Sequence, residues 1–167
     1  LLIILAFSCG FCFAQNLVPN SSFEIHNGCP QFLGQIDLAT NWSSFSISPD
    51  YFNSCATLPT LGVPVNARGS QQALDGNAYI GVVCYHPNDT AREYAGIQLL
   101  QPLIIGTKYY VSFYVSLADT LGLNCATSKI GIKFSTIPFT VNTPAPTNNF
   151  AHVFSSQIIS DKFNWTP

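Results

Sequence analysis

Few side chains of this 167-residue sequence could take part in catalysis, and those few are scattered along the chain. The sequence contains no GxSxG nucleophile motif, no HExxH zinc motif and no glycine-rich phosphate loop. Glu24 and Glu93 are its two glutamates, so a glycosidase would need aspartates from separate loops. His86 and Asp89 share one loop, but such a pair without a nucleophile is typical of a turn. The sequence therefore favours a protein that is not an enzyme.

The first 14 residues resemble the second half of a secretory signal peptide. Residues 1–7 form an uncharged apolar run, and Cys12 and Ala14 place small residues at the −3 and −1 positions before Gln15. The run of about 13 apolar residues is shorter than the roughly 20 that a transmembrane helix needs. Because residue 1 is leucine, the basic start of this segment is expected to be missing. We therefore expect export, a mature domain over residues 15–167 and no membrane span.

Four cysteines follow the expected signal peptide: Cys29, Cys55, Cys84 and Cys125. An exported chain enters an oxidising compartment, where an even number of cysteines indicates disulfides. Four cysteines permit three pairings, and four buried free thiols are the alternative. Zinc is less favoured, because no two of these cysteines have the spacing of metal ligands.

Alternating apolar and polar residues predict β-strands throughout the mature chain. The runs that alternate lie at residues 77–85, 92–99, 107–117 and 129–135. No stretch keeps a helical period for three turns, and Gly- and Pro-rich breaks separate the runs. Short antiparallel strands of this kind predict an all-β fold, an antiparallel two-sheet β-sandwich.

Composition narrows the function further. Only 8% of the residues are charged, with 6 Lys and Arg, 8 Asp and Glu and a net charge of −2. A nucleic-acid binder that relies on a basic surface needs clustered Lys and Arg, so we expect no nucleic-acid partner. With 47% hydrophobic and 13% aromatic residues, the chain has enough apolar side chains for a core and is not a disordered tail.

Several segments resemble known secreted modules. Asn16-Leu17-Val18-Pro19-Asn20-Ser21-Ser22-Phe23-Glu24 is similar to the opening of galactose-binding-like β-sandwich modules, a group that includes carbohydrate-binding modules. Further matching segments are 29–30, 35–39, 42, 49–55, 76–81, 92–94 and 109–119. Together they resemble a family of surface proteins from gliding bacteria with type IX secretion, over most of residues 16–135. In that family the module is often followed by an OmpA-like or a C-terminal sorting domain.

The resemblance implies a galactose-binding-like jelly roll at the cell surface or outer membrane, with further domains beyond residue 167. Family members carry an Asp-Asn pair ahead of the strand at 130–135, where this chain has Thr127-Ser128-Lys129. They also continue past a tryptophan like Trp165 into further strands. The sandwich in this sequence is therefore expected to be truncated at its C-terminal side, without its closing strands.

The matching segments also imply a disulfide pattern and a metal. Cys29 and Cys55 flank the Trp42 segment, and both lie in matching pieces, which favours the pairing Cys29–Cys55 and leaves Cys84–Cys125. Galactose-binding-like modules commonly hold a structural Ca²⁺ near the N-terminal strand, and Glu24 occupies the matching position. The partner acid usually comes from a last strand that this chain does not contain, and a solvated strand-end role for Glu24 is the alternative.

Alternation also predicts a face that could bind a ligand. Seven side chains point away from the aliphatic side of their strands: Tyr79, Tyr85, Arg92, Tyr94, Gln98, Tyr110 and Tyr114. If the strands share one sheet, these tyrosines form a platform on which sugar rings stack, with Arg92 and Gln98 as donors to hydroxyls. The alternative is that the tyrosines pack beneath loops or a second layer.

Two function hypotheses follow. The first is a non-catalytic recognition module that binds a glycan or a cell-envelope polymer. The second is a structural or adhesive domain of an outer-membrane or type IX-secreted protein with no small ligand, its tyrosines packing against a neighbouring domain.

Overall fold

The computed structural model describes residues 15–46, 48–84, 92–120, 126–137 and 151–167. In these ranges the chain forms eight short β-strands and a single short 3₁₀ helix, η1 (Ile36–Leu38). The predicted all-β class is therefore confirmed. Among the described residues, no helix has the length and apolar character needed to cross a membrane.

The strands pair antiparallel into four separate two-stranded sheets. β1 (Trp42–Ser46) pairs with β6 (Tyr94–Ile97), and β2 (Asp50–Asn53) pairs with β5 (Ala78–Gly81). The two smallest sheets join β3 (Val65–Asn66) to β4 (Gly69–Ser70) and β7 (Gly131–Ile132) to β8 (Val153–Phe154). Backbone hydrogen bonds extend the last pair to a bridge between Thr127 and Ile159.

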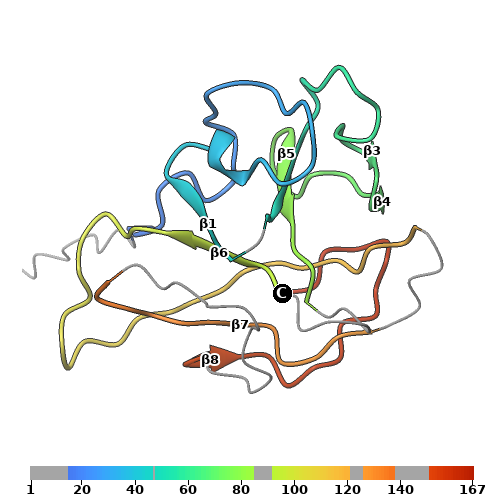
Figure 1. Ribbon diagram of the computed structural model, residues 1–167. Coiled ribbons are helices and arrows are strands. Elements are labelled where there is room, and N and C mark those ends of the chain that lie inside the picture. Colours follow the sequence, from blue (N-terminus) through green and yellow to red (C-terminus); the bar gives the residue numbers. More distant parts are fainter. Residues whose placement is uncertain (1–14, 47, 85–91, 121–125, 138–150) are drawn as a thin grey trace, which may run out of the picture.

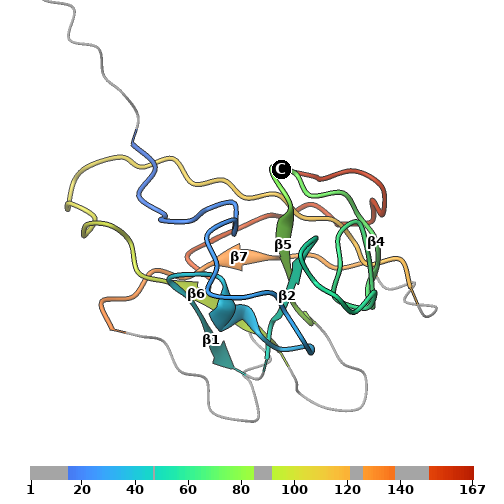
Figure 2. The same ribbon diagram turned by 90° about the horizontal axis from the view of Figure 1, so that it is seen from above.

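The elements lie in two tiers. The N-terminal sheets and η1 form one tier, and the segments from residue 103 onward, with β7 and β8, form the other (Figure 1). β6 lies where the two tiers meet (Figure 1). Seen from above, the β1–β6 and β2–β5 pairs lie beside each other over β7 (Figure 2).

The hydrophobic core belongs mainly to the N-terminal tier. Its buried hydrophobic side chains among the described residues are Ile36, Ala39, Tyr51, Phe52, Leu61, Ala78 and Ile159, and all but the last come from residues 36–78. The Tyr51 hydroxyl donates a 2.9 Å hydrogen bond to the Phe23 carbonyl, so its polar end is satisfied inside the core. A disulfide joins Cys29 to Cys55 with their Cα atoms 5.6 Å apart, as predicted. This tier therefore holds both the buried side chains and the covalent link.

Three of the four predicted strands are present but shorter than predicted. β5, β6 and β7 lie inside the predicted ranges 77–85, 92–99 and 129–135. The fourth prediction, a strand over 107–117, is wrong. Residues 108–114 form no backbone hydrogen bond with any described residue, and Val115 alone bridges to Thr166. Alternation predicts which way side chains point, but a strand also needs a partner backbone, and within the described ranges residues 108–114 have none.

Candidate functional site

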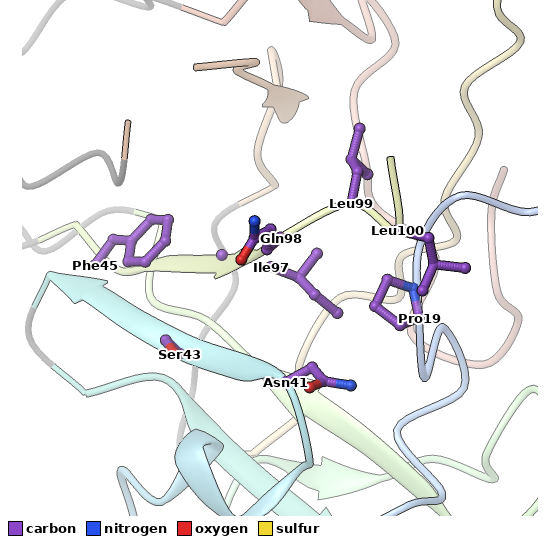
Figure 3. Close-up of a pocket in the computed structure, with 9 residues that line it drawn as sticks. Pro19, Asn41, Ser43, Phe45, Ile97, Gln98, Leu99 and Leu100 are labelled. Atoms are coloured by element: carbon purple, nitrogen blue, oxygen red, sulfur yellow. The ribbon is translucent and has the colours of Figure 1, made fainter. Parts of the chain in front are cut away.

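A groove of about 490 Å³ lies on the β1–β6 pair (Figure 3). The side chains that line it are Pro19, Asn41, Ser43, Phe45, Ile97, Gln98, Leu99 and Leu100, with the Gly96 backbone among them. Asn41 directly precedes β1 and Ser43 lies on it, while Gln98 lies just after β6 (Figure 3). The Leu100 amide donates a 2.9 Å hydrogen bond to the Leu17 carbonyl, which brings the Pro19 segment to one end of the groove.

The register of the two strands explains this arrangement. Ser43 lies opposite Gly96, so the two residues share one face of the pair. Side chains alternate along each strand, which places Asn41 and Phe45 on that face from β1 and Gln98 from the β6 side. A bulge between Ser44 and Ser46 interrupts the pairing next to Phe45. The groove therefore lies on one face of the β1–β6 pair, beside the bulge.

Gly96 lines the groove beside the Phe45 ring, which approaches it closely because glycine has no side chain. A Cβ atom at this position would overlap the Phe45 ring, whose Cε2, Cδ2 and Cζ atoms are its nearest neighbours. A glycine inside a strand marks a place where another group approaches the backbone closely. Here the approaching group is the aromatic ring, which closes one end of the groove.

The polar side chains in the groove are available to a ligand. Asn41, Ser43 and Gln98 are exposed, and their side chains form no hydrogen bond with any described residue. Asn41 has a φ of 72°, in the left-handed region where asparagine is one of the few tolerated non-glycine residues. None of the lining residues carries a charge. The groove thus offers two amides and one hydroxyl beside apolar surface.

The groove shares lining residues with a much larger cavity of about 2910 Å³, which residues of both tiers line. Six residues line both spaces: Phe45, Gly96, Ile97, Gln98, Leu99 and Leu100. Six of the seven predicted binding residues also line the large cavity: Tyr79, Arg92, Tyr94, Gln98, Tyr110 and Tyr114. The seventh, Tyr85, lies outside the described residues. The structure therefore brings the predicted residues to one hollow space.

These residues do not form the predicted flat platform, because they do not share one sheet. Tyr79 lies on β5 and Tyr94 on β6, which belong to different sheets, while Tyr110 and Tyr114 lie on the segment that pairs with no strand. Tyr110 is 92% exposed and Tyr114 is 48% exposed, so both rings are open to solvent. The aromatic surface is therefore the wall of a cavity between tiers.

Tyr79 has a structural role. Its ring contacts Phe52 at 5.5 Å and Trp165 at 5.6 Å between centroids, and its hydroxyl accepts a hydrogen bond from the Asn66 amide. Burial raises the pKa of this phenol above its ordinary value. Trp165 in turn donates a 2.8 Å hydrogen bond to the Gln72 carbonyl. Tyr79 thus links β5 to the C-terminal segment, and its ring is less available to a ligand than Tyr110 or Tyr114.

The Glu24 carboxylate, predicted as a calcium ligand, is held by Asn77. Oε1 accepts a 2.8 Å hydrogen bond from the Asn77 backbone N–H, and Oε2 lies 3.5 Å from its side-chain nitrogen. Gly76 is required beside it, because a Cβ there would overlap the carboxylate. Within the described ranges, no group of three or more His, Cys, Asp or Glu side chains could hold a metal ion. The calcium site stays a prediction.

Cys84 carries a free thiol, and Cys125 lies outside the described residues, so the second disulfide also stays a prediction. Burial raises the pKa of the Cys84 thiol, and the nearby Glu93 carboxylate raises it further. The thiol is therefore protonated at neutral pH and is a poor nucleophile.

A buried charged pair lies behind the cavity wall and was not predicted from the sequence. Asp50 is 1% exposed, and its carboxylate accepts 2.8 Å hydrogen bonds from Nε and Nη2 of Arg68 and a 2.9 Å bond from the Gly34 amide. Glu93 accepts a 2.7 Å bond from the Val83 amide, and burial raises the pKa of this carboxyl. These contacts tie β2 to Gly34 and to the segment just before β4, and join the segment before β6 to residue 83.

In comparisons with known proteins, no family model, no curated protein and no solved structure matches this chain.

Proposed function

We propose that this protein is a non-catalytic recognition module that binds a saccharide in the groove on β1 and β6. The observation that carries the proposal is the lining of the groove, which combines uncharged hydrogen-bonding groups with an aromatic ring and contains no charge. A groove of about 490 Å³ falls within the range of small-ligand sites, roughly 300–1,000 Å³.

The chemistry of a sugar ring fits this lining. Each amide of Asn41 and Gln98 offers a donor and an acceptor, and the Ser43 hydroxyl offers both, as neighbouring sugar hydroxyls require. The Phe45 ring gives the apolar C–H face of a sugar a flat surface. The groove has no charged residue that could pair with a charged ligand, and burying an unpaired charge is costly. A neutral polyol is therefore favoured at this position.

The wider setting of the module is part of the same proposal. We propose an exported, cell-surface domain with a jelly-roll β-sandwich architecture, linked to further domains of the same polypeptide. The Cys29–Cys55 disulfide supports an oxidising compartment, and the stacking of the two tiers supports a sandwich.

One observation favours the second candidate function, a structural or adhesive domain that contacts a neighbouring domain. Ile104 is 68% exposed and Ile105 is fully exposed, and both lie at the turn between Leu103 and Thr107. Neighbouring apolar side chains exposed at a turn are typical of a contact with another protein surface.

A glycan-array screen followed by affinity measurements tests the groove. The variant N41G/Q98A removes both amides, and glycine at position 41 keeps the left-handed backbone without strain. Its matched control is N27G/Q72A, which changes the same residue types at exposed positions away from the groove. Loss of retention in the first variant alone supports the proposal. Equal retention by both variants, or no saccharide retained by the wild-type domain, contradicts it.

A further inference from the structure

The charges of this chain are segregated in space. The chain has six Lys and Arg residues, and every one of them lines the large cavity: Arg68, Arg92, Lys108, Lys129, Lys133 and Lys162. Of the seven Asp and Glu residues within the described ranges, three line the same space: Asp75, Glu93 and Asp119. The cavity wall is therefore net positive in a protein whose net charge is −2.

This excess does not depend on one stretch of sequence. Arg92 precedes β6, Lys108 lies on the extended 108–114 segment, and Lys129 and Lys133 flank β7. Asp50 lies 2.8 Å from Arg68 and neutralises it. A cavity lined by one sign of charge concentrates the field and attracts ligands of the opposite sign. The six basic residues are scattered in the sequence, and folding brings them to the wall of one cavity.

One part of the wall pairs a cation with aromatic rings. Along 108–114 the even-numbered residues Lys108, Tyr110, Ser112 and Tyr114 are all exposed; of the odd-numbered residues, Val111 and Phe113 are half-buried and Tyr109 is 39% exposed. In an extended segment, alternate side chains share one face. The Lys108 side chain forms no hydrogen bond or ion pair with any described residue. An ammonium group and two open tyrosine rings are therefore presented together.

We propose that the large cavity binds an acidic polysaccharide, whose carboxylate groups face the basic residues and whose sugar rings stack on Tyr110 and Tyr114. This inference rests on the proposed saccharide binding and names the chemical class of the ligand. The uncharged groove on β1 and β6 then serves as a neutral subsite at the end of a positive cavity, since the two spaces share six lining residues. Anionic groups of the polymer occupy the cavity, and an uncharged part of it occupies the groove.

The test compares two oligosaccharides of equal length, an oligogalacturonate and its carboxyl-reduced, neutral counterpart, by isothermal titration calorimetry. At low ionic strength the acidic form is expected to bind at least about tenfold more tightly, and added salt is expected to reduce this preference. A sulfated oligosaccharide in a third titration shows whether carboxylate or any anionic group is preferred. If the neutral form binds as tightly as the acidic form, the proposed anion preference is wrong while the saccharide-binding function stands. If neither binds, both proposals are wrong.

Two variants with the same change in net charge test whether the acidic oligosaccharide is attracted to the cavity. K108Q removes one charge from the wall and is expected to weaken binding of the acidic form about two- to fivefold, the effect of an exposed ion pair. T57E changes the net charge by the same amount at an exposed residue outside the cavity and is expected to leave affinity unchanged. Equal weakening by K108Q and T57E, or equally tight binding of a single-stranded DNA of matched charge, overturns the proposal in favour of nonspecific attraction.

Discussion

The Phe45 ring lies against the backbone of Gly96 on the neighbouring strand, at the position a Cβ atom would occupy. The ring fits there because glycine has no side chain, and it closes one end of the groove. It also joins β1 to β6 beside the bulge, where the regular pairing is interrupted.

G96A is expected to destabilise the protein by about 1–3 kcal/mol, because the added methyl group displaces the Phe45 ring. F45A/G96A is expected to cost less than the sum of its two single variants, since removal of the ring frees the space. Urea denaturation of the four proteins measures both effects. Additive losses would show that the ring and the methyl group do not compete.

Loss of the Cys29–Cys55 disulfide is expected to lower the free energy of unfolding by about 3 kcal/mol. The bridge closes a loop with a sequence separation of 26, which restricts the unfolded chain by an amount of this order. C29S/C55S measured by urea denaturation gives the loss. The wild-type protein in a reductant serves as the control and should fall to the same stability, whereas the variant should not respond to the reductant.

R68A is expected to destabilise the fold by about 3 kcal/mol, because it leaves the buried Asp50 carboxylate without its cation. Breaking a fully buried ion pair costs about 3–5 kcal/mol. The lower value applies here because the Arg68 side chain is 35% exposed, so water can solvate Asp50 once the guanidinium is removed. The double variant R68A/D50N is expected to recover part of the loss. A stability for R68A equal to that of the wild type would show that the pair contributes nothing.

Glu93 is expected to make stability fall as the pH rises above 4.5, its ordinary pKa. Burial raises the pKa of this carboxyl in the folded state, so the native protein holds the proton more tightly than the unfolded chain. The stabilisation is therefore present below pH 4.5 and is lost as the pH rises through the raised pKa. E93Q keeps an acceptor for the Val83 amide and should be more stable than the wild type at pH 7.

Thermal denaturation of E93Q at pH 4 and pH 7 checks this sign. The advantage of E93Q should disappear at pH 4, where Glu93 itself is protonated. D75N removes a carboxylate at an exposed position and is the control. A wild-type protein that is more stable than E93Q at pH 7 would contradict the assignment.

The positions of the strands could be predicted from the sequence better than the pairing between them. Period-2 alternation located β5, β6 and β7, and it predicted the facing of residues 108–114, where Tyr110 is exposed and Val111 is half-buried. Pairing depends on contacts between distant segments, such as Ser43 with Gly96, and alternation carries no information about them. The predicted shared sheet of tyrosines was therefore wrong, although its described residues line one cavity.

The groove residues Asn41, Ser43 and Phe45 were not predicted from the sequence. A weak signal was present, because polar and aromatic residues alternate at 41, 43 and 45, and a glycine interrupts the strand at 96. The buried Asp50–Arg68 pair had no local signal, since its members are 18 residues apart and meet only through the fold. Burial of a single aspartate cannot be inferred from composition.

The concentration of buried side chains in residues 36–78 has a consequence for how the molecule opens. Six of the seven buried hydrophobic core residues in the described ranges and the Cys29–Cys55 disulfide lie in the N-terminal tier, while residues 108–114 have no backbone hydrogen bonds to the described chain. The amide protons of 108–114 are thus expected to exchange with solvent at nearly the rate of an unfolded peptide, and those of β2 only on global unfolding. The N-terminal tier is therefore expected to stay folded while residues 108–114 open, so Tyr110 and Tyr114 belong to the part of the cavity wall that opens first.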